Sequence, residues 1–203
     1  MKRSFMVFVL ASIAATIAAA QSVTWKSDQA HSNVTFSVNY MVLTEVTGNF
    51  KEFDATMTTN GEELANPSVK VAIKTSSINT ENERRDGHLR SADFFESEKY
   101  PEITFVSRSF EKGEGNQYKV TGDLTMHGVT KSVTIDARYM GQAKDMRGNL
   151  RVGFKGTTTV NRTDYGVKYN ATLEGGGLLI GNDVTVTINA QFIKQQEEAA
   201  RTN

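Results

Sequence analysis

Three histidines are the residues whose type could bind a metal or transfer a proton. His31, His88 and His127 are the only histidines in the chain, and no two of them have the close spacing of a zinc site. The interpretation that we favour is that each ring caps a turn or pairs with a carboxylate. Because the chain has no cysteine, disulfides, thiolate metal sites and a cysteine nucleophile are excluded. We expect no metal and no cofactor.

Nucleophilic catalysis has little support in the sequence. His31 and Ser32 are adjacent, and adjacent residues on a strand point to opposite faces. The chain also lacks the Gly-x-Ser-x-Gly motif of a nucleophile elbow. We therefore expect a protein that is not an enzyme and that has no catalytic residue.

A charged segment at 81–91, ENERRDGHLRS, predicts the one clear helix, and a shorter helix is expected over 93–98. Within the first helix Arg85 and His88 share a face, and Asp86 can reach Arg90 at i, i+4. If this helix covers a cavity, Arg85 or His88 could contact a ligand headgroup. The alternative, which we favour, is an ion-pair network that holds the helix in place.

The segment around Asn161 and Arg162 allows the same two interpretations. The candidate headgroup or rim residues are His31, Arg85, Asp86, His88, Asn161 and Arg162.

The remaining chain alternates apolar and polar residues with a period of two. The alternation is clearest at 33–40, 69–74, 118–124, 133–139 and 184–190. Such segments are typical of half-buried antiparallel strands. Between Phe50 and Phe53 the aromatic phase slips by one residue, as a β-bulge would require. We expect an all-β fold of eight or nine strands.

An antiparallel barrel and a sandwich both fit this pattern. Eight strands in a closed barrel leave an interior for side chains or one slender ligand, and slim polar residues such as Thr157–Thr159 favour the ligand. The candidate lining residues are the apolar alternates, each of which could instead be ordinary core. They are Val34, Phe36, Val38, Val71, Ile73, Phe105, Val120, Leu124, Ile135, Phe154, Val186 and Ile188.

The N-terminus predicts export. Lys2 and Arg3 precede an apolar run that ends in Ala18-Ala19-Ala20, the pattern of a signal peptide cleaved after Ala20. The expected organisation is a signal peptide at 1–20, one barrel domain at 21–194 and a polar tail at 195–203. No later stretch is apolar enough for a membrane helix, so we do not expect this chain to be an integral membrane protein. The balance of 23 basic and 23 acidic residues gives no reason to expect a nucleic-acid partner.

Four blocks of sequence resemble the YceI-like family of polyisoprenoid-binding periplasmic proteins. They are DQAHS at 28–32 with VTFSV at 34–38 and GNF at 48–50, INT at 78–80 with ERRDGHLRSADFF at 83–95 and KYPEITF at 99–105, GDLTMHGVTK at 122–131, and RVGF at 151–154 with NRTDYG at 161–166. The resemblance runs from about Trp25 to Phe192. Two positions depart from it, since Tyr40 stands where the family often has a histidine and Ser132 where a proline is common.

The resemblance implies a lipocalin-like antiparallel barrel with one short helix near its mouth. It also implies a periplasmic or secreted protein that carries an isoprenoid lipid of the quinone or polyprenyl type. Other amphiphiles, such as fatty acids or fatty amides, are the alternative ligands. An enzyme that acts on a lipid headgroup through Arg85, Asp86 and His88 is a weaker alternative, and a homodimer is left open.

The export prediction is checked by N-terminal sequencing of the protein recovered from the cell envelope. We expect a mature chain that begins at Gln21, because signal peptidase recognises the small residues at Ala18 and Ala20. An intact Met1 in the cytosolic fraction would show that the segment is not a cleaved signal.

Overall fold

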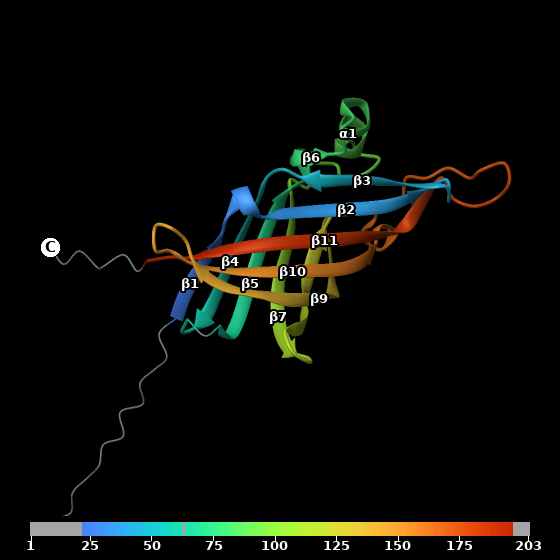
Figure 1. Ribbon diagram of the computed structural model, residues 1–203. Helices are drawn as coiled ribbons and strands as arrows, with labels where there is room; N and C mark the ends of the chain where they lie inside the picture. The colour runs from blue at the N-terminus through green and yellow to red at the C-terminus, as the bar shows by residue number, and fades with distance from the viewer. Residues whose placement is uncertain (1–21, 63, 197–203) are drawn as a thin grey trace, which may run out of the picture.

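The computed structural model describes residues 22–62 and 64–196, which form one antiparallel β-barrel. The expected signal peptide and most of the expected tail lie outside these residues. The strands are β1 (Ser22–Ser27), β2 (Asn33–Tyr40), β3 (Thr44–Phe50), β4 (Phe53–Asn60), β5 (Ala65–Lys74), β6 (Ile78–Asn79), β7 (Glu102–Lys112), β8 (Gln117–Met126), β9 (Val129–Lys144), β10 (Leu150–Asn161) and β11 (Ile180–Lys194). Figure 1 shows these strands wrapping around a common interior.

Six of these labels belong to three longer barrel strands, each of which is interrupted near its middle. The short 3-10 helix η1 (Gln29–His31) separates β1 from β2, Lys51 and Glu52 separate β3 from β4, and η2 (Thr75–Ser77) separates β5 from β6. When each broken pair is counted as one strand, the chain makes an eight-stranded up-and-down meander. The phase slip expected between Phe50 and Phe53 is one of these breaks.

Side-chain hydroxyls replace ladder hydrogen bonds where the strands break. The amide of Glu52 donates to Ser77 Oγ at 3.1 Å, and the amide of Ala55 donates to Ser27 Oγ at 3.0 Å. Ser77 Oγ in turn donates to the carbonyl of Lys74 at 2.7 Å. Buried backbone groups without a partner are costly, so these serines allow the sheet to bend without that cost.

The barrel closes through β11. One edge of β11 pairs with β10 along most of its length, from Arg151↔Ile193 to Asn161↔Asp183. The other edge pairs with β2 near its start and with β1 near its end, where Trp25 lies opposite Lys194. Closure leaves no free edge along β11, so this strand offers no template for pairing with another chain.

Two clusters of buried apolar residues lie in the barrel. The first contains Trp25, Met57, Val152 and Phe192, and the indole of Trp25, which is fully buried, donates to Thr59 Oγ1 at 3.0 Å. The second cluster includes Val34, Phe50, Phe53, Ile78, Ile103, Met126, Val160 and Tyr165.

The helix α1 (Glu83–Arg90) lies beside β3 and β6, outside the ring of strands (Figure 1). Asn82 caps it by accepting a hydrogen bond from the amide of Arg85 at 3.0 Å. The expected pairing of Asp86 with Arg90 is wrong. Asp86 is buried and accepts hydrogen bonds from Thr80 N at 2.9 Å and Thr80 Oγ1 at 2.5 Å, because a buried carboxylate needs donors that the solvent cannot supply.

The second helix, expected over 93–98, is also wrong. Residues 92–95 and 97–99 form turns, in which the amide of Phe95 donates to the carbonyl of Leu89 at 3.0 Å and that of Ser97 donates to Arg90 at 3.0 Å. These bonds fold the segment back onto the end of α1 instead of continuing it. No helix within residues 22–62 and 64–196 is both long and apolar enough to cross a bilayer.

The turn between β2 and β3 has an unusual backbone. The amide of Leu43 donates to the carbonyl of Tyr40 at 3.1 Å, and the two residues between them, Met41 and Val42, have φ angles of 56° and 61°. This left-handed region suits glycine and asparagine and costs other residues roughly 1–2 kcal/mol each. A β-branched residue such as Val42 is especially rare there.

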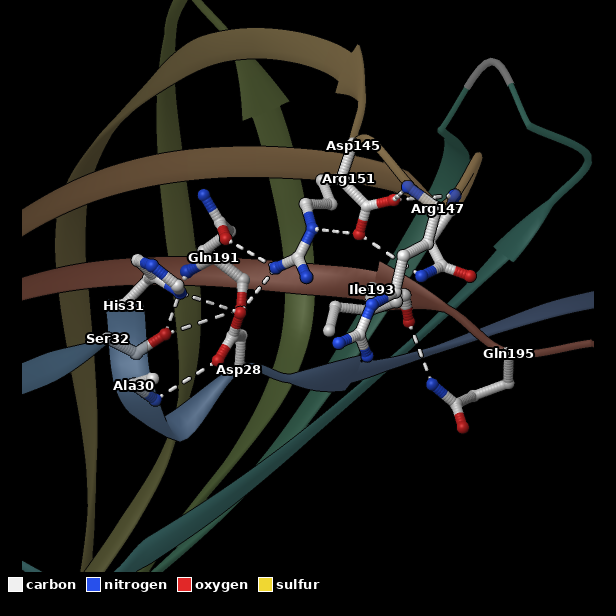
Figure 2. Close-up of polar contacts among 11 residues, drawn as sticks. Asp28, Ala30, His31, Ser32, Asp145, Arg147, Arg151, Gln191, Ile193 and Gln195 are labelled. Atoms are coloured by element: carbon white, nitrogen blue, oxygen red, sulfur yellow. Dashed lines mark hydrogen bonds and ion pairs between the residues drawn. The ribbon is translucent and has the colours of Figure 1, made fainter.

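Arg151 clamps the opposite end of the barrel (Figure 2). Its Nη1 donates to Asp28, which caps η1, and to Gln191 Oε1 of β11 at 2.8 Å. Its Nε donates to Asp145 Oδ2, in the β9–β10 turn, at 2.8 Å. The guanidinium therefore joins three segments that are distant in sequence.

The clamp changes the pKa of its members. Burial alone would raise the pKa of Asp28, but hydrogen bonds from Arg151 and His31 outweigh this effect and lower it. Hydrogen bonds from Arg151 and Asn149 lower the pKa of Asp145 well below its ordinary range. The folded state therefore binds these protons more weakly than the unfolded chain. Their stabilisation is complete above the ordinary carboxyl pKa of 3.8 and is lost as the pH falls through the lowered values.

We predict that Arg151→Met lowers the stability of the protein at pH 7 and flattens the loss of stability below pH 4. Without the guanidinium, the pKa values of Asp28 and Asp145 return towards the ordinary value, so folded and unfolded states differ less in proton binding. Urea unfolding at a series of pH values measures both effects. Arg147→Met, at an exposed arginine of the same turn, is the matched control, and an equal effect there would contradict the clamp.

Candidate ligand-binding cavity

The barrel encloses a cavity of about 830 Å³. This volume lies within the 300–1,000 Å³ range of small-molecule sites. All the apolar alternates named from the sequence line it. They are Val34, Phe36 and Val38 of β2, Val71 and Ile73 of β5, Phe105 of β7, Val120 and Leu124 of β8, Ile135 of β9, Phe154 of β10, and Val186 and Ile188 of β11. Whether they contact a ligand remains a prediction.

Two glycines let aromatic rings lie flat against the cavity wall. A Cβ on Gly48 would lie 2.5 Å from Cζ of Phe36, and one on Gly122 would lie 2.5 Å from Cζ of Phe105. Both distances are too short for any side chain, so each ring occupies space that only glycine provides. Both rings are part of the cavity wall.

Several lining residues escaped the sequence analysis. Phe105 and Phe110 both face the cavity, although residues five apart on a regular strand point to opposite faces. A register shift between Ser107 and Ser109 reverses the alternation of β7 and brings Phe110 to the inner face. Phe94 and Phe95 line the cavity from the turns after α1. Two adjacent phenylalanines after a charged helix suggest a buried contact, but a turn has no regular alternation from which the direction of their side chains could be predicted.

Polar groups enter the cavity wall from α1. Arg85 lines the cavity while its Nε and Nη2 donate to Oγ1 and the carbonyl of Thr80, each at 2.7 Å. His88 also lines the cavity, and its Nε2 lies 2.8 Å from Asp93 Oδ2. Its ring packs edge-on against Phe94 and Tyr169, at centroid distances of 5.0 and 4.8 Å. His88 therefore connects α1 to the loop at 166–179.

Arg162 is a second arginine of the cavity wall, and it is 5% exposed. Its guanidinium donates four hydrogen bonds to backbone carbonyls. The acceptors are Gly181 at 2.9 Å, Val167 at 2.8 Å, Tyr169 at 2.9 Å and Ile180 at 3.3 Å. Within the residues that the structure describes, it has no ion pair with a carboxylate. Burial lowers the pKa of Arg162, but a guanidinium keeps its charge.

The remaining rim candidates do not line the cavity. His31 belongs to the Arg151 clamp at the other end of the barrel, with Nδ1 2.8 Å from Asp28 Oδ2 (Figure 2). Asp86 supports the segment before α1, and Asn161 caps the 3-10 helix η3 (Arg162–Tyr165) by accepting from the amide of Thr163 at 3.0 Å. Of the six rim candidates the structure brings Arg85, His88 and Arg162 to one cavity.

The histidines stay apart in the structure. His127 lies in the β8–β9 turn, with Nε2 3.6 Å from Glu96 Oε2 and its ring tilted against that of Tyr100 at a centroid distance of 4.5 Å. No group of three histidine, aspartate or glutamate side chains that could hold a metal occurs in the part of the chain described. The expectation of function without a metal stays a prediction.

The family model described as the YceI-like domain matches residues 25–192. The chain belongs to the YceI-like family. Among curated relatives, a UPF0312 protein of Staphylococcus aureus (strain MSSA476) is 37% identical over 166 residues, which is 81% of this chain and 94% of the relative. A UPF0312 protein of Staphylococcus epidermidis (strain RP62A) is 38% identical over 166 residues, with the same shares.

Solved structures share the fold of this YceI-like chain. The YCEI protein of Campylobacter jejuni superposes with a TM-score of 0.66 and 31% identity, over 78% of this chain and 90% of that one. BcnA of Burkholderia cenocepacia has a TM-score of 0.71 at 23% identity, over 81% and 98% of the two chains. A polyisoprenoid binding domain from Saccharophagus degradans has a TM-score of 0.62 at 17% identity, over 84% and 98%. The family and the barrel expected from the sequence are confirmed.

We predict that Arg162→Met destabilises the protein by about 3 kcal/mol, because each buried carbonyl left without a donor costs roughly 1–3 kcal/mol and rearrangement recovers part of the loss. Arg162→Lys should be intermediate, since lysine keeps the charge but has fewer donors in a different geometry. Urea unfolding measures both variants.

Arg138→Met, at an exposed position of β9, is the control and should change the stability by less than about 0.5 kcal/mol. Equal stabilities for Arg162→Met and the wild type would show that the four carbonyl contacts do not hold the loop at 166–179.

Proposed function

We propose that this YceI-like protein is an exported carrier that holds one long isoprenoid lipid, of the quinone or polyprenyl type, inside its barrel. The observation that carries the proposal is a closed barrel around an apolar cavity of about 830 Å³. An eight-stranded barrel of this kind has room for one slender ligand. A lipid tail that carries no charge suits such a wall, because its burial removes no charged group from water.

The energetics support a long tail. Burying ten isoprenoid carbons is worth about 8 kcal/mol at roughly 0.8 kcal/mol for each carbon, before the cost of ordering the ligand is subtracted. The polyisoprenoid binding domain from Saccharophagus degradans, which has the same fold, supports an isoprenoid as the ligand class. Binding of this kind needs no reactive group, so the proposal includes no catalytic step.

A fatty acid is the second candidate ligand. Arg85 and Arg162 place two guanidinium groups in the cavity wall, and a guanidinium pairs well with a carboxylate. The same groups could meet a pyrophosphate or a quinone oxygen. The headgroup therefore decides between the two ligand classes, while the cavity accepts either tail.

Organic extraction of the purified protein, followed by mass spectrometry of the extract, tests the ligand class. We expect one lipid for each protein molecule, with masses spaced by isoprene units. A fatty acid in the extract would favour the second candidate. A protein that carries no lipid and takes up none from mixed lipid extracts would contradict both candidates.

The cavity itself is tested with Val71→Trp and Val120→Trp, which place a large ring in the cavity. We expect lipid content to fall sharply, because a blocked cavity cannot admit the tail, although the fold survives an overpacking cost of about 1–3 kcal/mol. Arg85→Ala and His88→Ala should reduce lipid content less and relax the preference for the headgroup, since contacts at an open rim are worth roughly 0–1 kcal/mol.

The matched control is Val106→Trp, because Val106 lies on β7 and is 41% exposed. Lipid per mole of folded protein is the measurement, with circular dichroism to verify the fold. If the Val71→Trp and Val120→Trp variants stay folded and keep their lipid while Arg85→Ala loses it, the affinity comes from contacts with the headgroup and not from the cavity.

A further inference from the structure

The β2–β3 turn carries three consecutive apolar residues at the far end of the barrel from the Arg151 clamp (Figure 1). Val42 is 81% exposed and Leu43 is 79% exposed, and Met41 is also exposed. Leu178, at the end of the loop at 166–179, is exposed beside them. We call Met41, Val42, Leu43 and Leu178 the apolar crest.

Hydrogen bonds hold the crest together. The amide of Met41 donates to the carbonyl of Leu179 at 2.8 Å, and Tyr40 pairs with Ile180 at the start of β11. Leu178 is itself held by a bridge to Thr172. Two segments that are distant in sequence therefore present their apolar residues at one tip.

The residues of this turn are unfavourable for its backbone conformation. Its two central positions have positive φ angles, for which asparagine and glycine are the favoured residues, yet the sequence places methionine and valine there. Those side chains are also exposed, so packing does not compensate for the strain. Strain that packing does not explain is a mark of a functional site.

The crest adjoins residues of the cavity wall. Tyr40 and Thr44, on either side of the turn, line the cavity, and so do Leu179 and Ile180 next to Leu178. A lipid that enters between these residues passes from the crest directly onto the apolar wall. The crest is therefore continuous with the ligand site.

We infer that the apolar crest inserts into the surface of a lipid bilayer and brings the mouth of the cavity to the membrane. The inference goes beyond the proposed function and rests on it only for the identity of the cargo. Exposed apolar side chains on a narrow tip can enter the boundary between headgroups and acyl chains. In that position the strained turn gains the apolar burial that it lacks in water.

A second copy of the chain is a poorer occupant. A stable dimer buries about 800 Å² on each partner, and four side chains on a convex hairpin tip fall well short of that area. A flat complementary surface is also missing from a tip that protrudes. A bilayer needs neither, because its acyl chains surround whatever enters.

The charges around the crest define the kind of bilayer. Lys168 is the one basic residue of the loop at 166–179, whereas Glu45, Glu174 and Asp183 are acidic and lie on the segments that flank the crest. This balance gives no attraction to anionic lipid. Docking therefore depends on apolar insertion, and anionic lipid does not strengthen it.

The test uses flotation of the full mature chain with phosphatidylcholine vesicles. Met41→Asn combined with Val42→Gly gives the turn its favoured residues and removes two apolar side chains. We expect vesicle binding to fall about tenfold or more while the temperature of unfolding rises, because the strain is relieved. Loss of binding in a protein that became more stable cannot be a folding defect.

The matched control is Met146→Asn. Met146 is an exposed methionine like Met41, but it lies in the β9–β10 turn at the other end of the barrel, and its replacement should leave vesicle binding unchanged. Equal loss in this control would overturn the inference, and so would wild-type binding in the crest variant. Binding that appears only when phosphatidylglycerol is added would overturn it too, since the attraction would then be electrostatic.

Tryptophan fluorescence locates the contact. The chain has one tryptophan, Trp25, which is fully buried in the other end of the barrel. Val42→Trp therefore adds the one reporter that can enter a bilayer, and its emission should shift to shorter wavelength on addition of vesicles. The same substitution at Met146 should give no shift. A Val42→Trp emission that vesicles leave unchanged would contradict insertion.

Two further measurements separate the alternatives. Sedimentation velocity of the wild type and of the crest variant tests the dimer, and a dimer that the crest variant dissociates would replace the bilayer as the occupant. Val120→Trp, which blocks the cavity, should still bind vesicles as the wild type does. Membrane docking is therefore tested by the crest variant, and lipid binding in the cavity is tested by Val120→Trp, so the failure of one hypothesis can be told from the failure of the other.

Discussion

Closure of the barrel through β11 is the constraint on which the rest of the structure depends. A cavity with an apolar wall exists only if the strands form a complete ring, and β11 completes it by pairing with β10 on one edge and with β2 and β1 on the other. The ring has no free edge along β11, so the long apolar alternation of its strands does not make the protein a template for aggregation. The same ring fixes which residues point inward.

The two ends of the ring are built differently. One end is sealed by Trp25 with its apolar neighbours and clamped by Arg151, which pairs with two carboxylates while joining three segments. At the other end, Arg162 and His88 hold the loop at 166–179 through carbonyl and aromatic contacts. Polar groups thus fasten both ends, and the second end also brings the guanidinium of Arg162 and the ring of His88 to the cavity wall.

Much of the fold and of the cavity wall could be predicted from the sequence. A strict period of two fixes the face to which a side chain points, so residues such as Val120 and Ile188 could be assigned to the interior without coordinates. The assignment failed where the period breaks. Phe110 lies beyond a register shift, and Phe94 lies in a turn, so neither has a phase that the sequence reveals. Asp86 is buried because the segment before α1 folds over it, and His31 is held beside Asp28, which Arg151 contacts from a distant part of the chain; a pattern of apolar residues contains neither contact.

The strand breaks have a consequence for how the sequence can vary. Apolar residues of the wall can exchange for others of similar volume at little cost, because burial is not directional. Ser27 and Ser77 have no such freedom, since their hydroxyls receive backbone amides at defined positions in the bent sheet. In this barrel, evolutionary tolerance is therefore greatest at the large apolar side chains of the cavity wall and smallest at two small serines. Ser27 is part of that wall and Ser77 is not, so the limit on both comes from the backbone amides that they accept and not from the ligand.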